Sequence, residues 1–413
     1  MKQELLQKYA QLIIETGINI QPEQVLFIQA DVESAFFVKY CVEAAYKRGA
    51  QEVVVTYSDQ NLIRLNFEYA KTEVLEQVPD YVLSRMEYLM DKKAARLNLL
   101  SVSPTLLEGI EPHKINAVNS AMVKQPIVQK MRQFSMNNTT QWCLAGVPSV
   151  AWAKQVFPQA QSDQEALEKM WEAILYTVRV NQESSPIDQW NKHNDILHKH
   201  NQLLNEYNFK SLVFTNSKGT NIEIGLVKNH VWAGGSEKAL NGFVFNPNMP
   251  TEESFTMPDR NRVNGRVYST KPLNYNGVLI DEFWLEFKDG KVVDFDAKEN
   301  KESLANLLDT DEGARHIGEI ALISHDSPIS NLNILFYNTL YDENASCHMA
   351  LGAAYPMNIK GGSTMDQETL LAQGGNVSHV HSDFMFGSSD MSIVGITYDN
   401  QHVTVFKDGN FVI

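Results

Sequence analysis

The sequence predicts an α/β N-terminal domain with a parallel sheet over residues 1–185 and an α+β C-terminal domain, rich in antiparallel strands, over residues 186–413. Three observations lead to this fold class. The 413 residues exceed the roughly 100–200 of a typical single domain. In the first half, short apolar runs alternate with helical segments. In the second half, short strand-like segments follow one another and are separated by turn-forming pairs.

The first half of the chain has the pattern of βαβ units. A short apolar run at 25–30 precedes a helical stretch at 33–48. Further strand-like runs occur at 52–57, 97–102 and 142–147. Strands that alternate with helices favour a parallel sheet. Neither GxGxxG nor GxxxxGK[ST] follows these runs, so the sequence supports neither a dinucleotide site nor a P-loop.

The character of the sequence changes after two helical stretches at 162–180 and 187–207. The polar segment between them ends in proline, and we place the domain junction near it. Helical insertions are expected near 302–321 and 330–355 within the second domain. Its strands are expected at SLVFTN, TNIEIGL, GVLIDEFWLEF, KVVDFD, SIVGITY and HVTVF.

Charge and cysteine usage limit the partners and the compartment. The chain has 35 Lys and Arg against 50 Asp and Glu, a formal net charge of −15, which disfavours nucleic acid and anionic membranes as partners. Three widely spaced cysteines form no disulfide framework and no CxxC zinc motif. The N-terminus resembles an amphipathic helix, and no apolar run is long enough to span a bilayer. These features predict a cytoplasmic protein.

The histidines concentrate in the second half: ten of eleven lie between His193 and His402. Imidazole is the commonest metal ligand and the usual proton carrier at neutral pH, so this half is expected to hold the chemistry. The chain contains no HExxH, no GxSxG and no papain-like cysteine segment. The familiar serine and cysteine hydrolase patterns are therefore disfavoured.

The segment SHVHSDFM at 378–385 has the most specific pattern. On an extended backbone His379, His381 and Asp383 share one face, and two imidazoles with a carboxylate can chelate a metal. A polar loop can carry the same residues without a metal. This segment alone therefore leaves both interpretations open.

Three other segments add candidate ligands. In TEESF, alternation points Glu252 and Glu253 in opposite directions, so one can bind while the other faces solvent. Glu319 precedes an apolar run, where a buried carboxylate is costly unless it is paired or metal-bound. His348 and Tyr355 lie seven residues apart, on one face if the segment is a helix. A solvated charge pair and a core histidine are the alternatives.

Taken together, these carboxylates and imidazoles favour a site for two divalent metals. Mixed sets of this kind suit Zn²⁺, Co²⁺ or Mn²⁺. The candidates outnumber the three protein ligands that one catalytic zinc usually takes. Two ions roughly 3.5–4 Å apart, with a bridging carboxylate and a bridging water, account for the excess.

The same segments carry a family resemblance. The sequences NMPTEESFTMPDR, GEIALI, LYDENASCHMALGAAYP and NVSHVHSDFM resemble the M29 or thermophilic-type metallo-aminopeptidases, the family of AmpS, PepS and aminopeptidase T. These motifs occur in the family order, and the resemblance covers essentially the whole chain.

The resemblance implies two divalent metal ions per chain, of Zn, Co, Mn or Mg. It identifies Tyr355 with the family's catalytic tyrosine and Glu319 with a bridging ligand, and it leaves out His379. Glu252, the unassigned acid of TEE, is a candidate general base. The implied metal ligands are Glu253, Glu319, His348, His381 and Asp383.

The implied activity is that of an aminopeptidase, which removes the N-terminal residue from peptides through a bridging water activated by two metals. Tyr355 would donate a hydrogen bond to the developing oxyanion. The resemblance further implies a homodimer and peptide substrates with a free N-terminus. The alternatives are a metal-dependent dipeptidase or amidohydrolase and a non-catalytic protein that binds metal or peptide.

Overall fold

The computed structural model describes residues 3–275 and 278–413. Two compact units make up the chain: Met1–Lys192 with Ser236–Pro250, and His193–Gly235 with Thr251–Ile413. The first unit therefore contains a segment that comes after the second unit has begun in the sequence. The three cysteines are buried free thiols. No helix within the described residues has both the length and the apolar character that crossing a membrane requires.

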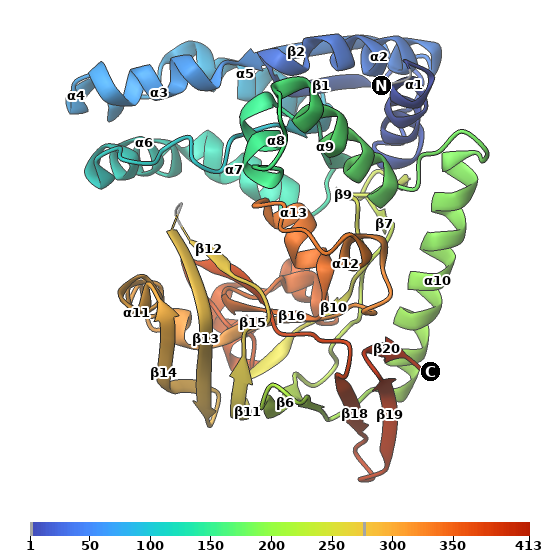
Figure 1. The fold of residues 1–413 in the computed structure, drawn as a ribbon, viewed down its shortest axis with the longest axis vertical. Helices are drawn as coiled ribbons and strands as arrows, with labels where there is room; N and C mark the ends of the chain where they lie inside the picture. The colour runs from blue at the N-terminus through green and yellow to red at the C-terminus, as the bar shows by residue number, and fades with distance from the viewer. Residues whose placement is uncertain (1–2, 276–277) are drawn as a thin grey trace. The chain divides into compact units, whose positions relative to one another are not determined.

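The first unit is built around a five-stranded parallel sheet with the order β2-β1-β3-β4-β9 (Figure 1). The four apolar runs predicted as strands form β1 to β4. Strand β9 comes from far along the chain and pairs with β4, where Leu144 lies opposite Asn248. The strands are β1 (Val25–Asp31), β2 (Glu52–Ser58), β3 (Ala95–Leu100), β4 (Trp142–Gly146) and β9 (Asn248–Met249).

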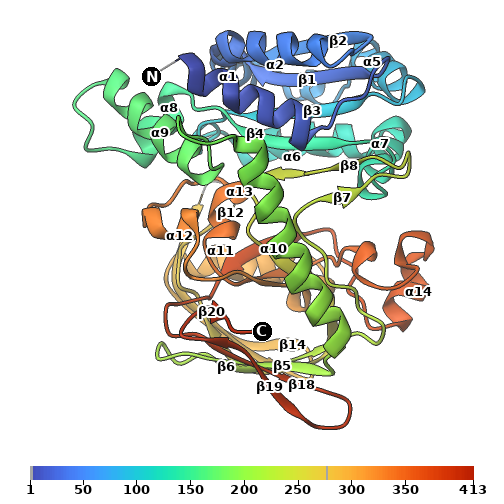
Figure 2. The same ribbon diagram turned by 90° about the vertical axis from the view of Figure 1, so that its right-hand side faces the viewer.

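Apolar packing holds the helices of the first unit. The ring of Phe37 lies 5.3 Å from that of Tyr9 and 5.6 Å from that of Trp171, which joins α1, α2 and α9 in one core. Figure 2 labels these three helices. A short hairpin of β7 (Glu237–Lys238) and β8 (Val244–Phe245) completes the unit. Its helices are α1 (Gln3–Leu12), α2 (Ala35–Lys47), α3 (Gln60–Tyr69), α4 (Thr72–Leu75), α5 (Asp80–Asp91), α6 (Pro112–Val123), α7 (Pro126–Met136), α8 (Val150–Val156) and α9 (Asp163–Thr177).

The second unit contains a nine-stranded antiparallel sheet with the order β12-β13-β11-β6-β5-β18-β19-β20, in which β14 also pairs with β13. Strand β11 was not predicted, because its polar sequence RNRVNGRVY lacks an apolar face of regular period. The strands are β5 (Ser211–Thr215), β6 (Asn221–Leu226), β11 (Pro258–Tyr268), β12 (Leu273–Tyr275), β13 (Val278–Lys288), β14 (Lys291–Glu299), β18 (Ser392–Ile396), β19 (His402–Lys407) and β20 (Asn410–Phe411).

A second, four-stranded antiparallel sheet of this unit carries most of the candidate ligands. Its order is β10-β15-β16-β17, and every residue of the first three strands is buried. The strands are β10 (Ser254–Thr256), β15 (Ile317–Leu322), β16 (His348–Gly352) and β17 (His381–Met385). The fold class of a parallel α/β region followed by an antiparallel α+β region is confirmed.

The structure corrects the helical insertions that the sequence predicted. Helices do occur in the predicted insertions near 302–321 and 330–355, but residues 317–322 and 348–352 are strands, so the prediction was wrong for these two runs. Both runs are buried on two faces and lack the alternation that distinguishes a strand from a helix. The helices here are α11 (Lys301–Leu308), α12 (Pro328–Leu332), α13 (Thr339–Asp342) and α14 (Gln367–Ala372), and α10 (Pro186–Tyr207) precedes β5.

Candidate metal centre

Three neighbouring strands of the small sheet place two acids in register. Glu319 on β15 pairs with Ala350 on β16, and Ala350 pairs with Asp383 on β17. Cross-strand partners lie on the same face of a sheet, so both carboxylates project to one side. His348 begins β16 and His381 begins β17, and both contribute to the same cluster.

Glycines allow the segments that carry ligands to approach one another closely. A Cβ on Gly234, whose φ is +136°, would lie 2.0 Å from the carbonyl oxygen of Glu253. A Cβ on Gly318 would lie 2.3 Å from the carbonyl oxygens of Gly352 and Ala353. A side chain at either position would push apart backbones that hold Glu253 and Glu319.

The first group of ligand atoms comes from Glu253, Glu319 and His348, which are all buried. Their ligand atoms lie within 4.8 Å of one another. The Nε2 atom of His348 is 3.4 Å from Oε2 of Glu253 and 3.4 Å from Oε1 of Glu319. Two atoms bound about 2.1 Å from one ion at a tetrahedral angle are about 3.4 Å apart, so this spacing fits a metal.

The second group lies on the other side of Glu319. The Nε2 atom of His381 is 3.8 Å from Oε2 of Glu319 and 3.4 Å from Oδ1 of Asp383. Within the described residues, these two buried carboxylate oxygens accept no hydrogen bond. Because unsatisfied buried acceptors are costly, they also fit a cation as partner.

Backbone carbonyls orient both imidazoles. The Nδ1 atom of His381 lies 2.7 Å from the carbonyl oxygen of Ala353, and that of His348 lies 3.4 Å from the carbonyl oxygen of Ser346. A proton on each Nδ1 can donate to these oxygens. Each Nε2 is then directed at the carboxylates, in the orientation that a metal-binding histidine needs.

The electrostatics of the cluster are those of crowded buried acids. Burial raises the pKa of Glu319. Burial alone would lower the pKa of the His348 imidazole, but its contacts with Glu253 and Glu319 raise it well above the usual value. Burial also opposes protonation of His381, yet Asp383 and Glu319 bring its pKa to about 10. Because metal ligands bind in their deprotonated forms, divalent cations would bind here in competition with protons.

Tyr355 lies beside this cluster, although not for the reason that its spacing suggested. Strand β16 ends at Gly352, so Tyr355 and His348 do not share a helix face as the sequence had indicated. Instead the ring of Tyr355 lies 4.8 Å from that of His381. Desolvation together with Glu319 and other nearby carboxylates raises the pKa of its phenol well above 10, so the hydroxyl keeps its proton.

Glu252 and Glu253 contact different partners, but the expectation that one of them faces solvent was wrong, because both are buried. The carboxylate of Glu252 is 3.6 Å from Nε2 of His193, and its backbone N–H donates to Oδ1 of Asn344 at 2.8 Å. Both Glu252 and His193 are buried. The structure therefore places Glu252 in a contact with His193, next to the cluster in sequence but outside its closest group of ligand atoms.

The sequence profile of the thermophilic metalloprotease family, M29, matches residues 2–411. The chain belongs to the M29 family. Aminopeptidase 2 of Geobacillus stearothermophilus is 44% identical over 406 residues, 98% of this chain and 97% of that protein. Aminopeptidase PepS of Streptococcus thermophilus is 42% identical over 410 residues, 99% of this chain and 98% of that protein.

A solved structure agrees with these relatives. This M29 chain and the wild-type AmpT of Thermus thermophilus superpose with a TM-score of 0.92 at 35% identity, over 99% of each chain. The predicted family is therefore confirmed, and the chain is a metallo-aminopeptidase by class. Membership of this metalloprotease family also implies a divalent metal cofactor.

Sequence reasoning about this M29 peptidase missed Glu343. Burial raises the pKa of its carboxyl group well above the usual value, and the charges of Asp383 and Glu253 add to the effect. The sequence did contain a signal for this residue, because Glu343 lies five residues before the candidate ligand His348 in the motif LYDENASCHMALG. His379, in contrast, is exposed, and its backbone N–H donates to Asp311 at 2.7 Å.

Proposed function

We propose that this M29 peptidase removes the N-terminal residue from peptides that carry a free α-amino group, with two divalent ions of Zn, Co, Mn or Mg per chain. One observation carries the proposal. The two oxygens of Glu319 face His348 and His381 separately, at 3.4 and 3.8 Å, as expected for a carboxylate that bridges two ions. Glu253 and His348 would hold one ion, and His381 and Asp383 the other.

Such a pair of ions would supply Lewis acidity at the scissile carbonyl and an activated water at neutral pH. The side chains of the protein set the charge of the site in which the peptide binds. Burial raises the pKa of Glu319 and Glu343, and bound ions would offset the negative charge of Glu253, Glu319 and Asp383. The aminopeptidase relatives support cleavage at the N-terminal end of a peptide.

Two further roles belong to residues around the cluster. Tyr355, which keeps its proton, would donate a hydrogen bond to the carbonyl oxygen as negative charge develops there. The base that accepts a proton from the attacking water would be Glu252 or Glu343. Glu343 is the stronger candidate by location, because its carboxyl group interacts with Asp383, Glu253 and Glu319.

The assembly and the compartment are part of the same proposal. Two chains would form a homodimer, since a closed two-fold assembly is the commonest among soluble oligomers. Three buried free thiols support a reducing compartment, the cytoplasm. The net charge of −15 supports small peptides and not nucleic acid as the partner.

The proposal is tested on purified protein by metal analysis and by hydrolysis of amino-acid p-nitroanilides, dipeptides and tripeptides. We expect about two divalent ions per chain, loss of hydrolysis with EDTA, and recovery with Co²⁺ or Zn²⁺. Activity that persists after chelation contradicts a metal mechanism. Cleavage of dipeptides without cleavage of tripeptides identifies a dipeptidase, and bound metal without turnover of any substrate identifies a binding protein.

A further inference from the structure

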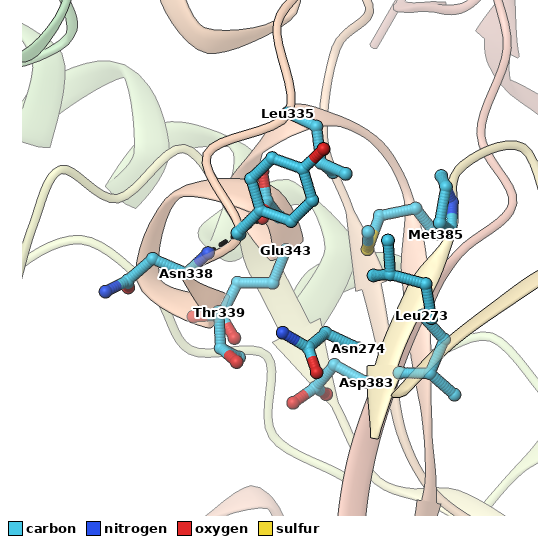
Figure 3. Close-up of a pocket in the computed structure, with 12 residues that line it drawn as sticks. Leu273, Asn274, Leu335, Asn338, Thr339, Glu343, Asp383 and Met385 are labelled. Atoms are coloured by element: carbon cyan, nitrogen blue, oxygen red, sulfur yellow. Dashed lines mark hydrogen bonds between the residues drawn. The ribbon is translucent and has the colours of Figure 1, made fainter. Parts of the chain in front are cut away.

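A cavity of about 230 Å³ adjoins the metal centre within the second unit (Figure 3). Leu273 and Met385 lie on one side of it, and Asn338 and Thr339 lie on the other. Asp383, a proposed metal ligand, is part of its lining. The cavity is therefore continuous with the place where a substrate would react.

The size of the cavity restricts what it can hold. Pockets for whole drug-sized ligands usually measure about 300–1,000 Å³, so a cavity of about 230 Å³ suits a single side chain. Glu343 lines it together with Asp383, and both belong to the acidic cluster. A peptide bound at the cluster has one side chain that can enter the cavity without a turn of its backbone.

We propose that this cavity receives the side chain of the residue that is released, and that Leu273, Leu335 and Met385 make it selective for aliphatic side chains. The inference rests on the proposed function. Glu343 and Asp383 line both the cavity and the proposed metal centre, so the α-amino end of a peptide bound at that centre would lie beside the cavity. The first side chain branches from the carbon that bears this amino group, so it starts nearest to the cavity.

The walls determine which side chains are accepted. Leu273, Leu279, Leu335 and Met385 offer apolar surface that rewards burial of a Leu or Met side chain. Among the lining residues that the structure describes, none is Lys or Arg. Asp and Glu side chains would meet the carboxyl groups of Glu343 and Asp383, whereas the nearby cation Lys271 interacts with Asp342, so the cavity disfavours acidic side chains.

The wall formed by residues 335–339 is rigid before any substrate binds. Asp342 accepts hydrogen bonds from the backbone N–H groups of Phe336 at 2.7 Å and Asn338 at 2.9 Å. These bonds hold Tyr337 between them in a left-handed conformation, with φ of +56°. A preformed wall distinguishes side chains by shape, because it does not repack around each one.

The test compares p-nitroanilides of Leu, Met, Phe, Ala and Glu on the metal-loaded enzyme. We expect kcat/KM for Leu to exceed that for Ala by about 10-fold or more and that for Glu by about 100-fold or more. Leu335→Phe fills the cavity and should lower the ratio of Leu to Ala by about 10-fold. Leu335→Ala widens it and should raise the ratio of Phe to Leu substrates. Because Leu335 is only half-buried, both variants are expected to fold.

Ile334→Phe is the matched control, because Ile334 is next to Leu335 in the same segment but is not among the described lining residues. It should keep the Leu to Ala ratio of the wild type. A parallel series of Leu-Xaa dipeptide amides varies the second residue. Leu335 variants that change preference at the second residue alone, or that lower all substrates equally, overturn the inference.

The outcome also separates this inference from the proposed function. If the wild type hydrolyses none of the substrates although its metal content is full, the proposed function fails. If the wild type is an active aminopeptidase but prefers Glu or Ala to Leu, only the role of the cavity is wrong.

Discussion

Strand β1 of the first unit and strand β15 of the second are both buried, but they bury different chemistry. The interior of β1 is apolar from Val25 to Ile28, and its buried acid, Asp31, lies at the strand end, where it accepts a hydrogen bond from the backbone N–H of Glu33. Strand β15 has the sequence IGEIAL and buries the carboxylate of Glu319 among apolar neighbours. Apolar burial stabilises β1 without a partner, whereas a buried carboxylate costs several kcal/mol unless it is compensated. The contrast supports the small sheet of the second unit as the place of the proposed function.

The largest expected effect comes from removing the charge of β15. Glu319→Gln keeps the shape of the side chain but removes the anion that faces both histidines. We expect loss of metal and a fall in kcat/KM by a factor of about 10³ or more. Glu302→Gln, on the exposed first turn of α11, is the control and should behave as wild type. A Glu319→Gln enzyme with full metal and near-normal turnover would show that this carboxylate is structural.

The next effect distinguishes the two candidate bases. Glu343→Gln should lower kcat by about 10²–10⁴, the range of general-base catalysis, while Glu252→Gln should change it by less than about 10-fold. The reason is location, because Glu343 interacts with the acidic cluster whereas Glu252 contacts His193. Metal content is measured for both variants, so that loss of the cofactor is not mistaken for loss of a base. The reverse order of effects would assign the base to Glu252.

Tyr355→Phe should have a smaller effect, a fall in kcat of about 10² to 10³. The variant loses the hydroxyl but keeps the ring that lies 4.8 Å from the ring of His381. If the hydroxyl stabilises the oxyanion, KM and metal content should stay close to those of the wild type. An unchanged kcat would leave Tyr355 with a packing role only.

Local patterns in the sequence predicted much of the fold. The β-branched and apolar runs of β1 to β4 are short and flanked by helical segments, so their type and order could be predicted. Strands β15 and β16 could not, because a fully buried strand of five or six residues has no periodic signature. Strand β9 could not be predicted either, because Asn248 joins a sheet whose other strands all lie between Val25 and Gly146, far earlier in the sequence.

The candidate site shows the same limit. The four segments selected by the family motifs do lie together in the structure, and the roles of their residues stay predictions. Spacing alone suggested His379, which is exposed, and overlooked Glu343, whose carboxyl group interacts with Asp383 and Glu253. Whether an acid on a loop points into a cluster depends on the path of the backbone. In this chain that path is set by the turns after α13, which sequence patterns do not encode.

The smallest expected effect tests the comparison of β1 and β15 most directly. Ile28 in β1 and Ile320 in β15 are both fully buried, and Ile→Val at either site removes one methylene. Each change should cost about 1 kcal/mol of unfolding free energy, measured by denaturant titration.

The two variants should differ in their affinity for metal. Ile320 is next to Glu319, so a small shift of that carboxylate should weaken metal binding by up to about 10-fold. Ile28→Val should leave metal affinity and kcat unchanged, because β1 contributes only packing. If both variants lowered metal affinity equally, the two sheets would be energetically coupled, and the contrast between a structural and a functional sheet would not hold.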